Sequence, residues 1–168
     1  GGVVEAVHSV HAVAVQDGAV IAEAGDPHLV AFMRSSSKPL QALPLARARD
    51  DLEPRDLAIA SASHLADDAQ LAAVRGLLEK APATVDELEC GPEGTPPSPL
   101  NHNCSGKHAG MLALCRARGW PSEGYRLPDH PVQRAMAAVH AEAAQVEERE
   151  LPTGVDGCGV VTFALPLE

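Results

Sequence analysis

Apolar segments of helical spacing and of strand-like spacing follow one another along this chain, and this succession limits its fold more than any other feature. Residues 3–15 and 20–24 mix Val and Ala with polar positions on either side of Asp17-Gly18, a pattern typical of a β-hairpin. Helical spacing of apolar residues predicts four helices, over residues 39–49, 67–80, 106–118 and 131–146. Short apolar runs predict further strands, over residues 57–61 and after the glycine-rich turn at 154–159. The expected class is α/β, of the mixed α+β kind.

The composition limits what can fill the core of such a fold. Hydrophobic residues make up 45% of the chain but aromatic residues only 2%, so the core must consist mainly of Ala, Val and Leu. A length of 168 residues suits one ordinary domain, and neither an internal repeat nor a linker divides the sequence. We therefore assign residues 1–168 to a single domain.

Charge and hydropathy argue against two classes of partner. A net charge of −10 disfavours nucleic acid and an anionic membrane surface, because both require clustered Lys and Arg. No apolar run approaches the roughly 20 residues that span a bilayer, and no signal-peptide pattern is present, so we expect a cytoplasmic protein. The apolar stretch at 163–167 predicts an exposed strand edge that can associate, which makes a homodimer a candidate assembly.

Lysine is rare in this chain, and one lysine stands in the stretch "RSSSKPL". Of the 13 basic residues only Lys38, Lys80 and Lys107 are lysines, and a lysine, unlike an arginine, can act as a neutral base. If a helix begins near Ser36, Ser35 and Lys38 share one face, and a neutral Lys38 can take the proton of a nucleophilic serine. The competing interpretation is that the serines simply cap the helix.

A second candidate cluster is "NHNCSGKHAG", residues 101–110. It is not a phosphate-binding loop, because Asn101 and His108 stand where Gly and Ser or Thr are required. Cys104 and Cys158 with His102 or His108 would suit zinc. The alternative is a pair of unreactive buried cysteines.

A third candidate is "SASH", which places Ser63 beside His64 at the end of the expected strand over 57–61. Neighbouring side chains on a strand point to opposite faces, so a direct Ser63–His64 dyad is not expected.

Several blocks together resemble one enzyme family. In order they are "RSSSKPLQALPL", "ASH", "CGP", "NCSGKHAGMLAL", "DHPVQRA" and "GVDGCGVVTFALPL". They are similar to the L-asparaginase II family, the Rhizobium etli type of L-asparaginase, and the similarity runs from "GGVVE" to the last residue. The resemblance implies hydrolysis of the side-chain amide of L-asparagine to aspartate and ammonia. It also implies a fold similar to that of serine lactamases and glutaminases.

The resemblance further implies roles for single residues. Ser35 and Lys38 match a first Ser-Lys pair, and Ser63 matches the serine of a second pair. Cys104, Lys107 and Cys158 match a zinc site, although a lysine ligand must first lose its proton. The residues that match substrate-contacting or neighbouring groups are Arg34, His108 and Asp156. The family continues into a second half that carries the lysine partner of Ser63, so the chain is expected to be the N-terminal portion of a longer amidohydrolase domain.

Two other functions remain open on the sequence. One is a lactamase-like acyl-serine hydrolase, although its S-D-N and K-T-G companion motifs are absent. The other is a non-catalytic half-domain that zinc stabilises.

Overall fold

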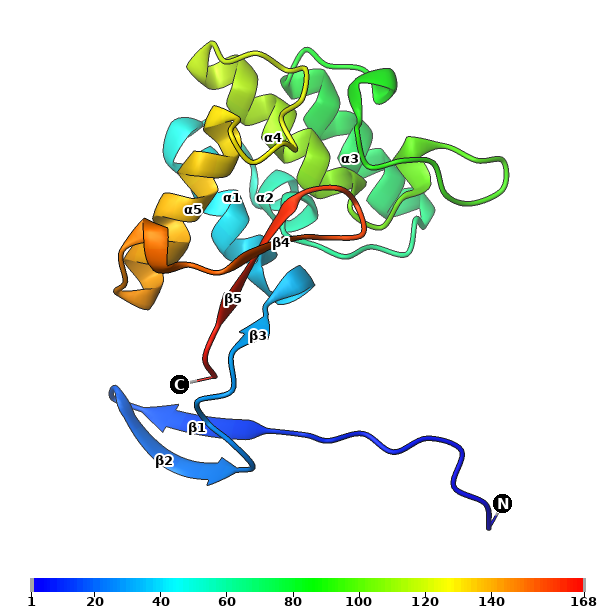
Figure 1. The fold of residues 1–168 in the computed structure, drawn as a ribbon. Coiled ribbons are helices and arrows are strands. Elements are labelled where there is room, and N and C mark those ends of the chain that lie inside the picture. The colour runs from blue at the N-terminus through cyan, green and yellow to red at the C-terminus, as the bar shows by residue number, and fades with distance from the viewer. Residues whose placement is uncertain (1, 168) are drawn as a thin grey trace.

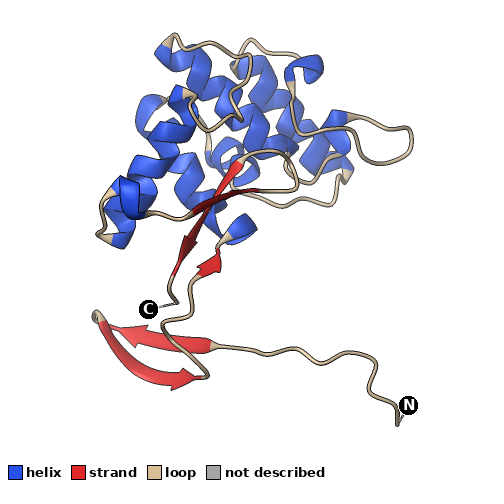
Figure 2. Cartoon of the chain, viewed as in Figure 1, coloured by secondary structure: helices blue, strands red, loops and turns tan. Residues whose placement is uncertain are grey.

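The structure is a computed structural model and describes residues 2–167. A body of helices carries two small antiparallel sheets, and one of these, a hairpin, lies apart from the body (Figures 1 and 2). The helices are α1 (Lys38–Ala48), α2 (Pro54–Ala60), α3 (Asp68–Lys80), α4 (Ser105–Arg118) and α5 (Pro131–Ala144). Short 3₁₀ helices occur at Arg34–Ser37, Val85–Glu87, Pro99–Asn101 and Glu148–Glu150. The expected mixed α+β class is confirmed.

The N-terminal hairpin forms where the sequence predicts it. Strands β1 (Ala12–Gln16) and β2 (Ala19–Ala24) pair antiparallel, and Asp17 and Gly18 both have positive φ in the turn between them. A two-residue turn of this kind requires positive φ at both positions, which Asp and Gly tolerate. The first strand is shorter than predicted, because residues 2–11 form no strand.

The second sheet joins the start of the helical body to the end of the chain. Its order is β3 (Ala31–Phe32), β5 (Val161–Leu165) and β4 (Thr153–Val155), with β5 in the middle. Phe163 is therefore fully buried, and its ring lies 4.2 Å from that of His140 on α5. The expected exposed edge at 163–167 is wrong for Phe163 and Ala164, because β5 has a partner on each side.

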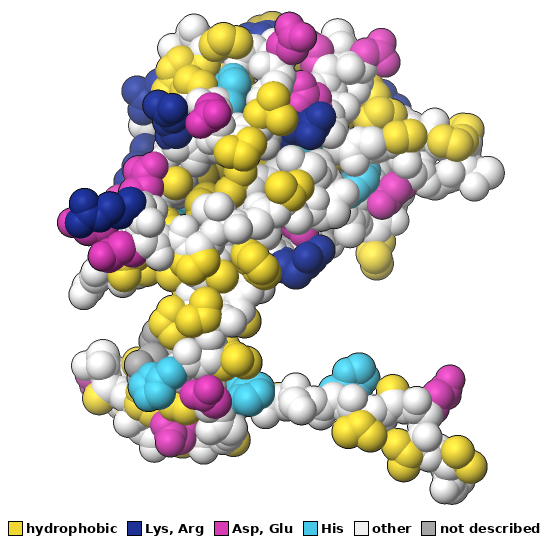
Figure 3. Space-filling model, in the orientation of Figure 1, with side chains coloured by type: hydrophobic (Ala, Val, Ile, Leu, Met, Phe, Trp, Pro, Cys, Tyr) yellow, Lys and Arg dark blue, Asp and Glu magenta, His cyan; other side chains and the backbone are white. Residues whose placement is uncertain are grey.

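Part of the exposed apolar surface lies on the hairpin and on residues 29–32, which lead from it to the helical body (Figure 3). The large exposed side chains there are Val15, Val20, Ile21, Leu29, Val30 and Phe32. None of the helices within residues 2–167 is long and apolar enough to cross a membrane.

Four predicted helices are confirmed within a few residues. At the start of α3, Asp67 accepts a hydrogen bond from Gln70 N while the Gln70 side chain accepts from Asp67 N, a reciprocal cap. At the end of α4, Gly119 takes a left-handed φ of 66°. Pro39 lies in the first turn of α1, where its missing N–H costs no hydrogen bond.

The predicted strand over 57–61 is wrong, because these residues belong to α2 and the turn that ends it. Glu53 and Asp56 form a reciprocal cap around Pro54 at the first helical position. A short apolar run is compatible with either a buried strand or a buried helix, and here the start signals three residues upstream decide for the helix.

Helix α4 lies at the centre of the body. Every residue from Ser105 to Cys115 is buried, and α4 packs against α1, α2 and α3. Gly106 and Gly110 face α2 directly, which brings the two helices close together. The N-terminal turn of α4 is thereby held against α1 and the loop after α2.

Candidate active site and thiol cluster

Lys38 is the first residue of α1 and its side chain is completely buried. Its Nζ lies 2.7 Å from Ser63 Oγ and 2.8 Å from the carbonyl oxygen of Ala62. No ion pair with a carboxylate reaches Lys38 within residues 2–167, so both of its partners are neutral oxygens. Loss of the proton from Lys38 leaves no buried carboxylate unpaired, and the neutral amine can accept a proton from Ser63 along the same contact.

Ser35 has a different position from the one its spacing predicts. The residues before Lys38 form a 3₁₀ helix, and the exposed Ser35 makes no side-chain hydrogen bond to Lys38. The neighbouring hydroxyls of Ser36 and Ser37 donate to the carbonyls of Met33 and Arg34. Neither helix start here has a side-chain cap, so the capping interpretation of the serines is not supported.

Ser63 lies in the loop after α2, not on a strand. Its hydroxyl is bonded to Lys38, whereas the ring of His64 contacts Ser105 and Ala66. The expectation of no direct Ser63–His64 dyad agrees with this geometry, but the reason is the shape of the loop.

A cluster of two thiols and an amine lies at the start of α4. Cys104 and Lys107 belong to α4 and its cap, and Cys158 lies in the turn between β4 and β5. Lys107 Nζ lies 3.2 Å from Cys158 Sγ, and all three side chains are buried. A hydrogen bond from the Cys104 thiol, aided by His108 and Lys107, lowers the pKa of Cys158 well below its usual range. The same hydrogen bond, together with burial, raises the pKa of Cys104. Cys158 is thus the thiolate of the pair and Cys104 holds the proton.

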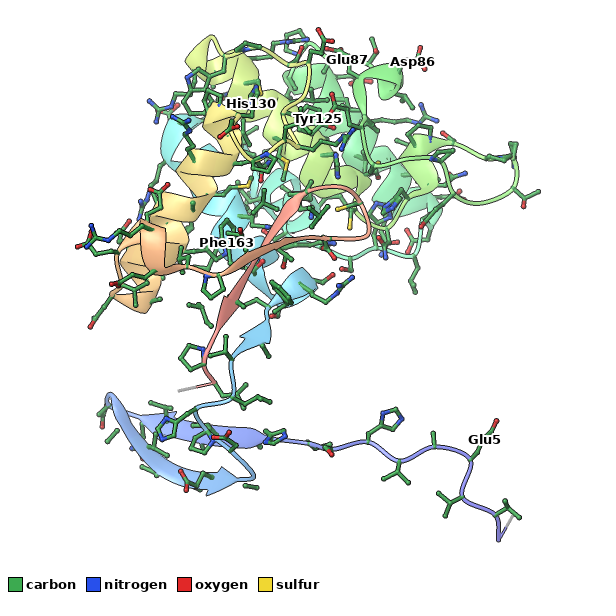
Figure 4. All side chains as sticks on the ribbon, in the orientation of Figure 1. Glu5, Asp86, Glu87, Tyr125, His130 and Phe163 are labelled. Atoms are coloured by element: carbon green, nitrogen blue, oxygen red, sulfur yellow. The ribbon has the colours of Figure 1, made fainter. Side chains whose placement is uncertain are left out.

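His108 lies one residue beyond Lys107 and is buried under the same cluster. Its Nδ1 is 2.8 Å from the hydroxyl of Tyr125, which also accepts a hydrogen bond from Glu89 N. Tyr125 lies inside the helical body beside α4 (Figure 4). Burial lowers the pKa of His108, so the ring is neutral. The Tyr125 hydroxyl thus has a polar role between His108 and the backbone at Glu89.

Asp156 connects the thiol cluster to the turn that carries Ser35. Its carboxylate lies 2.8 Å from Arg34 Nη2 and 4.0 Å from Lys107 Nζ. The charge of Lys38 also acts on the Cys104 thiol and opposes the rise of its pKa. The ion pairs of Asp156 thus connect Arg34, the residue before Ser35, to Lys107 in the thiol cluster, while a separate hydrogen bond joins Lys38 to Ser63.

The side chains at the thiol cluster limit which metal it could hold. Within residues 2–167 no group of three or more His, Cys, Asp or Glu side chains is arranged to hold a metal. A zinc ion here would depend on the Lys107 amine as its third donor beside two sulfurs. The donor chemistry suits zinc, because two buried sulfurs and one buried amine lie together here, and each can bind zinc once it has lost its proton.

An open cavity of about 830 Å³ lies beside His64. Polar side chains line much of it, among them Arg75, Glu93, Asn101 and Asn103. A second hollow of about 370 Å³, between α1, α4 and α5, is mainly apolar and includes none of the site residues. The first cavity therefore borders the loop after Ser63, at His64, Leu65 and Ala66.

Comparison with known proteins adds one finding. A family model described as L-asparaginase II matches residues 1–168. No curated protein matches the chain.

Proposed function

The chain belongs to the L-asparaginase II family, and on this premise we propose that its site hydrolyses the side-chain amide of L-asparagine to aspartate and ammonia. The observation that carries the proposal is the 2.7 Å contact between the buried Lys38 Nζ and the Oγ of the exposed Ser63, with no carboxylate paired to the amine. A serine and a lysine at this distance suit proton transfer to the amine and attack of a serine oxygen on an amide carbon.

The proposed reaction is acyl transfer in two stages. Lys38 takes a serine proton, the serine oxygen attacks the amide carbon, and ammonia leaves with a proton that Lys38 returns. Water then releases aspartate from the acylated serine. Ser63 has one of two roles in this scheme. It attacks the amide carbon itself, or it passes a proton from Ser35 to Lys38 while Ser35 attacks.

We further propose that Cys104, Lys107 and Cys158 hold a zinc ion. When bound, zinc would supply a fixed positive charge beside the substrate. In the protein itself, the Asp156 carboxylate forms ion pairs with both Arg34 and Lys107. A change of charge at the thiol cluster would therefore act on the turn that carries Ser35.

Ammonia release from L-asparagine by Ser63→Ala and Ser35→Ala tests the proposed reaction. We expect Ser63→Ala to lower kcat by about 10³-fold, because both routes pass through its hydroxyl. Mass spectrometry of chain quenched during turnover identifies the acylated serine: Ser63 indicates direct attack and Ser35 indicates the relay. Full activity of Ser63→Ala would contradict both routes. Turnover of a β-lactam chromophore without ammonia release would instead identify a lactamase-like hydrolase.

Zinc content after dialysis tests the metal proposal. We expect about one zinc per chain, and its loss in Cys158→Ser, because the serine hydroxyl does not replace a thiolate ligand. Cys115→Ser is the matched control, since Cys115 is buried in α4 outside the cluster. Equal zinc binding by the three proteins would overturn the assignment. Zinc binding without ammonia release would favour a non-catalytic, zinc-stabilised domain.

A further inference from the structure

We infer that His64 is a positioning residue for Ser63, and that its ring joins the loop of Ser63 to the start of α4 and so holds the serine against Lys38. The inference rests on the proposed function for its kinetic consequence, while the hydrogen bonds that carry it are independent of that function.

The two ring nitrogens of His64 have different partners. Ala66 N–H donates to Nδ1 at 3.1 Å, so Nδ1 is unprotonated and the proton of the neutral ring lies on Nε2. Nε2 is 2.8 Å from Ser105 Oγ, and the Ser105 hydroxyl donates to the carbonyl of Leu100 at 2.8 Å. Only one assignment of protons satisfies this chain: Nε2–H donates to Ser105, and Ser105 donates to Leu100.

The backbone of the loop is restrained on both sides of the ring. His64 N donates to the carbonyl of Asn103, and the Gln70 side chain accepts from Leu65 N and Asp67 N. Ala66 has a φ of 58°, a left-handed conformation that costs an alanine about 1 kcal/mol or more. The loop keeps this conformation because hydrogen bonds restrain it along its length.

These restraints act on Ser63 through its two neighbours. On one side, the carbonyl of Ala62 is bonded to Lys38; on the other, His64 is bonded to Asn103, Ala66 and Ser105. Ser63 itself is exposed, so packing does not fix its position. Misplacing a reacting atom by about 1 Å can lower a rate by about 100-fold, which makes these restraints important for turnover.

The charges around His64 favour the neutral ring that this arrangement needs. Burial, then the positive charge of Lys38 and the neighbouring His102, lower the pKa of His64, while Asp67 and Glu93 oppose the change weakly. A second proton on Nδ1 would face the N–H of Ala66, a contact between two donors. Protonation of His64 on acidification would therefore release the loop.

Matched variants separate the two ring contacts. His64→Asn keeps an acceptor for Ala66 N–H but loses the donor to Ser105. His64→Gln keeps an amide that can reach Ser105 but loses the acceptor for Ala66 N–H. Ser105→Ala removes the partner of Nε2 without changing His64. We expect kcat for ammonia release to fall by about 10-fold in Ser105→Ala and by about 100-fold in His64→Ala, with KM changed by less than about threefold. The losses of kcat in His64→Asn and His64→Gln should lie between these two values.

His130 offers a matched control in the same chain. Its Nδ1 accepts from Val132 N, the same ring-to-backbone contact two residues ahead, but it lies at the start of α5 (Figure 4). His130→Asn should leave kcat unchanged. Wild-type kcat in both Ser105→Ala and His64→Ala, or an equal loss in His130→Asn, would overturn the inference.

Long-range ¹H–¹⁵N spectra of the 168-residue chain give a readout without turnover. We expect the Nε2–H tautomer of His64 in the wild type, and faster exchange of the Ala66 amide in Ser105→Ala and His64→Gln. The Nδ1–H tautomer, or unchanged exchange in both variants, would overturn the inference even if ammonia is released. A wild type that shows the expected tautomer but releases no ammonia would instead count against the proposed function.

Discussion

Replacing Lys38 with methionine is expected to lower ammonia release from L-asparagine by about 10³-fold or more, because the proposed base disappears. Methionine has nearly the length of lysine and suits a side chain that is completely buried, so the fold should survive. The hydrogen bonds to Ser63 Oγ and the Ala62 carbonyl are lost as well. Steady-state ammonia release, with folding verified by circular dichroism, measures the effect.

Lys38→Arg and Lys80→Met complete this experiment. An arginine keeps the positive charge and can still donate hydrogen bonds, but it does not lose its proton at ordinary pH, so its loss of kcat should be comparable. Lys80 lies at the end of α3 and forms ion pairs with Glu53 and Asp56, neither of which is a proposed site residue. Lys80→Met should therefore retain kcat. More than a tenth of wild-type activity in Lys38→Met would exclude Lys38 as the base.

The second large effect is expected on stability, from Gly106→Ala. A Cβ at Gly106 would lie 2.2 Å from the carbonyl oxygen of Ile59 and 2.9 Å from its carbon, so α2 and α4 would have to separate. Backbone atoms cannot rotate away as a flexible side chain can, and we expect a loss of about 3 kcal/mol or more in the free energy of unfolding. Urea denaturation followed by circular dichroism measures it.

Two other helical glycines make the stability experiment selective. A Cβ at Gly110 would lie 3.0 Å from Ala60 Cβ, a milder contact, so Gly110→Ala should cost less than Gly106→Ala. A Cβ at Gly76 on α3 would meet no atom of residues 2–167 within 4 Å beyond its chain neighbours and the backbone of its own helix, and Gly76→Ala should stabilise by about 0.5–1 kcal/mol through helix propensity alone. The reverse order of these three variants would show that the close approach of α2 and α4 is not what Gly106 permits.

The features predicted correctly from the sequence are those that residues close along the chain decide. Asp17-Gly18 selects a tight turn, and the helical spacing of apolar residues over 67–80, 106–118 and 131–146 predicts α3, α4 and α5 within a few residues. Each of these signals acts within about four residues, the reach of a turn or a cap. The motif blocks predict a set of site residues, because a resemblance carries the identity of residues without their contacts.

Only the tertiary structure decided which of these residues meet. Lys38 contacts Ser63, not Ser35, because a 3₁₀ turn precedes α1 and the packing of α2 brings the later serine to the amine. Cys158 joins Lys107 across the fold because β5, as the central strand, brings its turn to the start of α4. The restraint of His64 by Ser105 also required the fold. In each case the partners lie far apart in sequence, and the packing of whole elements, rather than any local pattern, determines their distance.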